Sequence, residues 1–136
     1  MAVGDYERNG MSHWLDRAFL VGPYYRLCLS EREFHKELDR MEFKGAKPSF
    51  LATDHADAST HFLTYEDKLT AIVTLRVGKH TGIQVAAMLC HEAVHIWQDF
   101  RRHIGERSPG DETEAYAIQT IAQRLMESYQ KQTRKR

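Results

Sequence analysis

The chain has 136 residues, a length that predicts a single domain over residues 1–136 with its own hydrophobic core. Its 19 basic and 19 acidic residues give a net charge of zero, which does not favour nucleic acid or an anionic membrane as partner. The first residues lack the basic-then-apolar pattern of a signal peptide, so none is expected, and no apolar run is long enough to span a bilayer. The two cysteines are too few for a disulfide framework. We therefore expect a cytoplasmic protein with free thiols and no membrane or nucleic-acid partner.

The first third of the chain predicts two helices. One is expected over about residues 12–20, where apolar side chains recur at helical spacing before the Gly22-Pro23 break. The other is expected over about residues 31–41, because Ser30 and Glu33 have the spacing of a capping box. The side chains expected on its buried side are Phe34, Leu38 and Met41.

The middle of the chain predicts strands. A short strand is expected at residues 50–53, a better one at 61–65, and the best at 69–77, which is rich in β-branched residues. The short connection at residues 66–68 predicts a hairpin between the last two. Residues 54–59 are expected to form an exposed loop.

Two long helices are expected in the last third. Thr81 and Gln84 form a second capping box, and the helix that follows is expected to stop near Gly105. Residues 83–90 are apolar with hardly a break, which predicts a helix that is central and buried. The segment Ser108-Pro109-Gly110-Asp111 is expected to start the final helix, with Pro109 acceptable in its first turn. This helix is expected to run to about Tyr129 and to be followed by a solvated basic tail.

The motif His91-Glu92-x-x-His95 lies within the first of these two helices. Two histidines four positions apart share one helical face, so both imidazoles can bind one ion. This is a zinc-ligand spacing, with Glu92 placed beside the metal to transfer protons. The alternative is a pair of core histidines that only form hydrogen bonds with the backbone.

A third ligand is expected from the final helix. Glu114 follows His95 after eighteen residues, enough for the first helix to end and a second to return beside it. Glu114 begins an apolar helical stripe, which predicts that it points inward; the stripe continues with Ile118, Ile121 and Leu125. Glu114 could instead cap its own helix together with Asp111, and Glu112 and His103 remain alternative ligands.

Other side chains near the motif have simpler expected roles. Cys90 is turned by about 100° from His91 around the helix, which predicts a small buried core residue. His61 and His80 lie near the strand ends that flank the motif, and either could touch substrate. His13, His35 and His55 are expected on the surface.

The spacing of the candidate ligands resembles the ligand scheme of gluzincin zinc metallopeptidases: His91-Glu92-x-x-His95 is followed, after eighteen residues, by Glu114. The short chain is similar to minimal zincin-like proteins of phage genomes, and residues 88–98 resemble the active helix of SprT-like proteases. The metzincin pattern is excluded, because Arg101 stands where its third histidine would be. The resemblance implies one Zn²⁺ bound by His91, His95 and Glu114, with Glu92 as general base and acid. It also implies that the strand at residues 61–65 is a sheet edge that pairs with an extended peptide.

These observations predict an α+β fold of the minimal zincin-like type. We expect a small, mainly antiparallel sheet of about three strands, packed on the motif helix and the Glu114 helix, with helices before them. The expected activity is zinc-dependent hydrolysis of a peptide or protein substrate. Two alternatives stay open: an inactive zincin-fold binding protein, and a SprT-like nucleic-acid-associated protease that uses the basic tail. The oligomeric state is not predicted.

Overall fold

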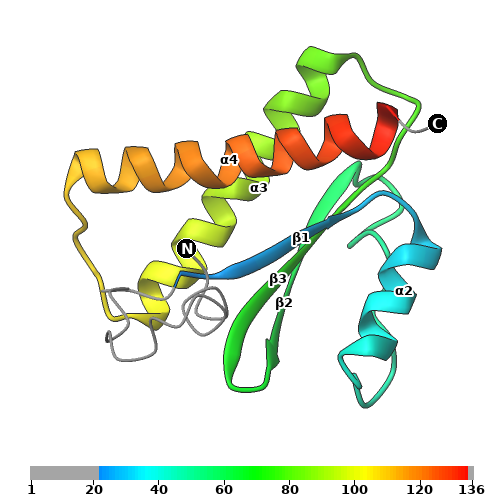
Figure 1. The fold of residues 1–136 in the computed structure, drawn as a ribbon, viewed down its shortest axis with the longest axis horizontal. Coiled ribbons are helices and arrows are strands. Elements are labelled where there is room, and N and C mark those ends of the chain that lie inside the picture. Colours follow the sequence, from blue (N-terminus) through cyan, green and yellow to red (C-terminus); the bar gives the residue numbers. More distant parts are fainter. Residues whose placement is uncertain (1–21, 135–136) are drawn as a thin grey trace, which may run out of the picture.

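The computed structural model describes residues 22–134, and the helix expected over residues 12–20 lies outside this range. Three layers make up the described part, with the sheet between α2 on one face and α3 and α4 on the other (Figure 1). In chain order the elements are β1 (Tyr24–Cys28), α2 (Glu31–Arg40), β2 (Ala58–Tyr65), β3 (Lys68–Leu75), α3 (Gly82–His103) and α4 (Asp111–Arg134). The expected α+β class is confirmed.

The sheet has three strands in the order β1-β3-β2. The expected hairpin is present as the antiparallel pair of β2 and β3, whereas β1 pairs with β3 in parallel. The sheet has three strands as expected, but it is mixed, since the shorter of its two pairings is parallel. β1 itself was not expected from the sequence, because its ladder partner lies more than forty residues away along the chain.

The two faces of the sheet cover separate apolar clusters. Alternate side chains of β3 point to opposite faces, as the pleat requires. Val73 and Leu75 pack with α3 and α4, and Ile72 packs with α2. The expected buried side of α2 is confirmed, because Phe34, Leu38 and Met41 are all buried there.

Two expectations for the segment before β2 are wrong. Residues 50–53 do not form a strand. Instead, the Phe50 carbonyl oxygen accepts hydrogen bonds from side chains of the sheet, the Thr74 hydroxyl and the His61 ring. The loop expected to continue to Ser59 ends earlier, because β2 begins at Ala58 and Ser59 is buried.

The caps of α3 are as expected, but its burial is not. Thr81 and Gln84 form the capping box, and Gly105 adopts a left-handed φ of 78° just beyond the helix end. Only one face of α3 packs against the sheet and α4, so Ile83 is 84% exposed and Cys90 is exposed as well. The predictions of an all-round buried helix and of a core Cys90 are wrong, because no layer covers the outer face of α3 within residues 22–134.

α4 extends beyond its predicted end. It continues to Arg134, and Gln132 Nε2 donates a hydrogen bond to the Leu27 carbonyl oxygen of β1 at 3.0 Å. The start of the expected basic tail is therefore helical and anchored. The inward stripe of α4 is confirmed, with Ile121 and Leu125 in the core and Ile118 packed against it. No helix within residues 22–134 combines the length and apolar character that a bilayer crossing requires.

Candidate metal centre

His91 and His95 present their rings to one another on the exposed face of α3. Their Nε2 atoms are 3.0 Å apart and their ring centroids 4.7 Å apart. Two nitrogen ligands of one tetrahedral zinc ion, each at about 2.0–2.1 Å from the metal, lie roughly 3.3 Å from one another. The observed separation is close to this spacing, and it is also the distance of an N–H···N hydrogen bond between the two rings. The exposure of both rings argues against the alternative of a buried, backbone-bonded histidine pair.

Glu92 lies beside this pair but on the inner side of α3. The residue is only 6% exposed, and its Oε2 atom accepts a hydrogen bond of 2.5 Å from the Thr60 hydroxyl of β2. Glu92 and His91 line a cleft of about 410 Å³ between α3 and the start of β2. The other lining residues are Asp57, Ala58, Ala87 and Met88. Thr60 was not singled out from the sequence, because only the packing of β2 on α3 brings its hydroxyl to Glu92.

Glu114 lies in the first turn of α4 and is turned toward α3. Its Oε2 atom accepts a hydrogen bond of 2.8 Å from the indole Nε1 of Trp97. No hydrogen bond joins its carboxylate to the start of its own helix among residues 22–134, so the capping alternative is not realised there. The other two candidates, Glu112 and His103, are exposed.

The three expected ligands are not gathered into one cluster. Among residues 22–134, no three His, Cys, Asp or Glu side chains lie close enough together to hold one metal ion. The structure brings His91 and His95 together, and it places the Glu114 carboxylate on Trp97 rather than beside the two rings. Trp97 is a residue that sequence reasoning did not identify.

Two further polar groups lie near the motif. Asp99 follows His95 by one helical turn, and its Oδ2 atom is buried without a hydrogen-bond partner in the described part of the chain. His80 Nε2 lies 3.3 Å from the Asp57 carboxylate at the rim of the cleft. The two groups are close, but they are not oriented to form a hydrogen bond. Of the two histidines expected near substrate, His80 is thus the one beside the cleft.

His61 lies on the opposite face of the sheet, against α2. Its ring stacks on Phe34 with centroids 4.6 Å apart, and its Nε2 is 3.0 Å from the Phe50 carbonyl oxygen. Desolvation by burial lowers the pKa of the imidazole below its usual 6.5, and the Phe50 carbonyl and the Glu92 charge oppose this only in part. His61 therefore belongs to the α2 core and is directed away from the cleft.

The outer edge of β2 is free within residues 22–134, since β2 pairs only with β3. Its hydrogen-bonding pattern follows from the hairpin turn. Glu66 and Asp67 have left-handed φ values of 51° and 61°, typical of a two-residue type I′ turn whose flanking residues form a hydrogen-bonded pair. Because this pattern alternates along antiparallel strands, the unpaired N–H and C=O groups belong to the even-numbered residues. These are Ala58, Thr60, Phe62 and Thr64.

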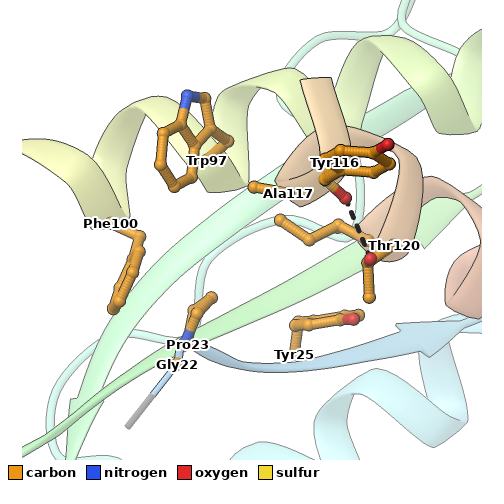
Figure 2. A pocket seen from close by; sticks show the side chains of 9 residues that line it. Gly22, Pro23, Tyr25, Trp97, Phe100, Tyr116, Ala117 and Thr120 are labelled. Atoms are coloured by element: carbon orange, nitrogen blue, oxygen red, sulfur yellow. Dashed lines mark hydrogen bonds between the residues drawn. The ribbon is translucent and has the colours of Figure 1, made fainter. Parts of the chain in front are cut away.

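A second, apolar cavity lies on the other side of α3. Figure 2 shows Trp97 and Phe100 of α3 facing Tyr116 and Ala117 of α4, with Pro23 and Tyr25 on the side of β1. Its volume is about 430 Å³. Trp97 therefore lines this cavity with its ring and binds Glu114 with its N–H group.

Comparison with protein-family models, with curated proteins and with solved structures found no match to this chain.

Proposed function

We propose that this protein is a zinc-dependent metallopeptidase of the gluzincin-like type, with His91, His95 and Glu114 as metal ligands and Glu92 as the proton-transfer residue. The observation that carries the proposal is the 3.0 Å approach of the two Nε2 atoms next to a buried glutamate that lines an open cleft. A zinc ion in this place would supply a Lewis acid and lower the pKa of a bound water molecule toward about 7.

Glu92 is suited to the proton-transfer step. The general base takes the proton of the attacking water and returns it to the amine that leaves when the peptide bond breaks. The Thr60 hydroxyl occupies Oε2 of Glu92, so Oε1 is the oxygen that can take up the proton. The hydroxyl also restrains the carboxylate in one orientation, which favours a defined path for the proton.

The outer edge of β2 is suited to bind the substrate. An extended peptide can add to a free sheet edge through main-chain hydrogen bonds, which give affinity without demanding a particular sequence. Thr60 contributes both an unpaired backbone edge and the hydroxyl that binds Glu92. A peptide paired at Thr60 and Phe62 would therefore run beside the catalytic carboxylate.

Glu114 remains the proposed third ligand. It is the carboxylate that the first turn of α4 directs toward α3, and Glu112 and His103 are exposed. Titration with zinc tests this choice. Glu114→Ala should weaken zinc binding by orders of magnitude, whereas the matched control Glu112→Ala should bind zinc like the parent protein.

Elemental analysis of the purified protein and cleavage of casein with and without a chelator test the activity. We expect about one zinc per chain and cleavage that the chelator abolishes. Glu92→Gln should keep zinc and the fold but lose activity by about 10²–10⁴-fold, the usual contribution of a general base. A Glu92→Gln protein that cleaves at the parent rate would refute the proposal.

A binding protein that keeps the same surface without hydrolysis is the second candidate. The observation that favours it is that the Glu114 carboxylate is bound to Trp97 and not gathered with the two imidazoles. Such a protein would bind an extended peptide along β2 and leave casein intact even when loaded with zinc. The same cleavage assay separates the two candidates.

A further inference from the structure

The apolar cavity on the far side of α3 from the cleft has aromatic walls. Figure 2 shows Trp97 and Phe100 projecting into it from α3, and Tyr116 from α4. Trp97 and Phe100 are both buried, whereas Tyr116 is 63% exposed, so the cavity is open on the side of α4 within residues 22–134. Its volume of about 430 Å³ lies within the range of sites that bind small ligands or side chains.

Polar groups along the cavity are already paired. The indole N–H of Trp97 donates to Glu114, and the Thr120 hydroxyl donates to the Tyr116 carbonyl oxygen at 2.9 Å. Neither donor is therefore free for a polar ligand. The chemistry that suits these walls is that of apolar side chains, whose removal from water is favourable without any hydrogen bond.

The described part of the chain begins at this cavity. Gly22 and Pro23 are its first two residues, and both line the cavity. Since each residue spans at most about 3.3–3.6 Å, Phe19 lies no more than about 11 Å from Gly22. A segment attached this closely has an effective concentration of about millimolar order or more, which an apolar ligand free in solution would have to match.

The residues just before Gly22 carry the apolar side chains that such a cavity needs. At about 100° per residue, one helical face about 140° wide holds Met11, Trp14, Leu15, Ala18 and Phe19. The charged residues of the same segment fall on the other side. An amphipathic segment of this kind needs an apolar surface to cover, and the cavity is the surface nearest to its end.

We propose that residues 11–21 dock in the apolar cavity, with the rings of Trp14 and Phe19 packed against Phe100 and Tyr116. The segment would then extend the packing of α3 on α4 and cover the open side of the cavity. This proposal does not depend on the proposed function, because the cavity and the cleft lie on different sides of α3.

Nuclear Overhauser effects in the unmodified full-length protein test the docking directly. Ring protons of Trp14 or Phe19 should give contacts with the methyl groups of Ala117 and Ile121, two residues that line the cavity. The absence of any such contact would overturn the proposal. Contacts that survive an isotope filter between labelled and unlabelled chains would also overturn it, because the occupant would then be a second copy.

Thermal melts of variants give a second measurement, with a chelator present so that no metal contributes. Trp14→Ala and Phe19→Ala should each lower the melting temperature by roughly 5–15 °C, as expected for the loss of a buried aromatic ring. Tyr6→Ala is the matched control, since it removes an aromatic ring of the same terminus outside residues 11–21, and it should melt like the parent. Equal melting of Trp14→Ala and the parent, or an equal loss in Tyr6→Ala, would contradict the proposal.

Binding of the apolar dye anilinonaphthalene sulfonate tests whether the cavity is covered. Well below the melting temperature, the parent protein should bind the dye weakly and Trp14→Ala should bind more of it, because the variant uncovers apolar surface. A parent protein that binds the dye as strongly as Trp14→Ala would show that the cavity is open to free apolar ligands, and the docking proposal would fail.

Discussion

At the scale of single residues, the Thr60 hydroxyl is the contact that holds Glu92 in place. It approaches the carboxylate to 2.5 Å in a position that is only partly open to solvent. Thr60 lies in β2 and Glu92 lies in α3, 32 residues later in the sequence, so this contact exists only in the folded protein. It makes Thr60 a residue on which proton transfer should depend.

Replacing Thr60 by valine should lower kcat/KM by about tenfold or more, because a hydrogen bond to a charged group contributes about 1.5–3 kcal/mol. Zinc affinity should not change, since Thr60 is not a ligand. Peptide-cleavage kinetics and zinc titration measure the two effects. Thr60→Ser keeps the hydroxyl and should retain most of the activity; an equal loss in both variants would show that the methyl group, and not the hydroxyl, matters.

We expect His61 to make the stability of the fold depend on pH. Burial lowers the pKa of its imidazole below 6.5, so the folded protein binds this proton less readily than the unfolded chain. The contribution of His61 to the free energy of unfolding is therefore full above about pH 6.5 and is lost as the pH falls toward the folded-state pKa. Urea denaturation between about pH 5 and 8, with a chelator present, measures this slope.

Replacement of His61 by glutamine should flatten the fall in stability below about pH 6.5, because glutamine does not titrate. The matched control His103→Gln replaces an exposed histidine at the end of α3 and should keep the parent's slope. If His61→Gln showed the same acid-dependent loss as the parent, another group would have to be responsible for it.

At the scale of elements, β2 is the strand that would bind the substrate in the proposed function. One of its edges pairs with β3, and the other is unpaired within residues 22–134. The type I′ turn at Glu66 and Asp67 determines which residues of β2 direct their N–H and C=O groups toward β3 and which direct them outward. The hydrogen bond of 2.8 Å from Arg76 N to Asp57 O continues the same alternation beyond the strand ends.

This alternation predicts opposite effects for proline at two adjacent positions. Phe62 directs its N–H outward, so Phe62→Pro should keep the sheet and weaken peptide binding, seen as a raised KM. Leu63 directs its N–H to β3, so Leu63→Pro should break a ladder hydrogen bond and destabilise the fold by roughly 3 kcal/mol or more. Circular dichroism melts and cleavage kinetics of the pair test the register; a folded Leu63→Pro beside an unfolded Phe62→Pro would mean that the edges are assigned the wrong way round.

At the scale of the whole molecule, the proposed metal would connect two helices that meet through apolar packing and the hydrogen bond between Trp97 and Glu114. α3 would supply two ligands and α4 the third, and both helices share the main core cluster with the sheet. A ligand that binds only the folded state stabilises it by mass action, by about 2.7 kcal/mol at a concentration 100 times its Kd. Zinc should therefore raise the melting temperature of the whole domain.

Thermal melts with increasing zinc measure this stabilisation. The melting temperature of the parent protein should rise with zinc concentration, and that of His95→Ala should respond far less. His103→Ala, which replaces another histidine of α3, should behave like the parent. A melting temperature that does not depend on zinc in the parent protein would contradict the proposed centre.

Local patterns in the sequence were enough to predict α2, the hairpin, the caps of α3 and the shared face of His91 and His95. Each of these depends on residues a few positions apart, whose spacing alone determines which side chains are neighbours. For the same reason, the inward stripe of α4 that begins at Glu114 could be read from periodicity. The motif and its expected chemistry are of this local kind.

Tertiary packing decided the rest. Three features bring together segments far apart in the chain: the parallel pairing of β1 with β3, the contact of Thr60 with Glu92, and the contact of Trp97 with Glu114. The exposure of Cys90 likewise depends on which side of α3 the other elements cover. Periodicity shows that a helix has an apolar side, but it does not show how much of that side another layer will cover. The sequence by itself therefore determined the two imidazoles and their glutamate, whereas the folding of β2 and α4 against α3 determined which groups surround them.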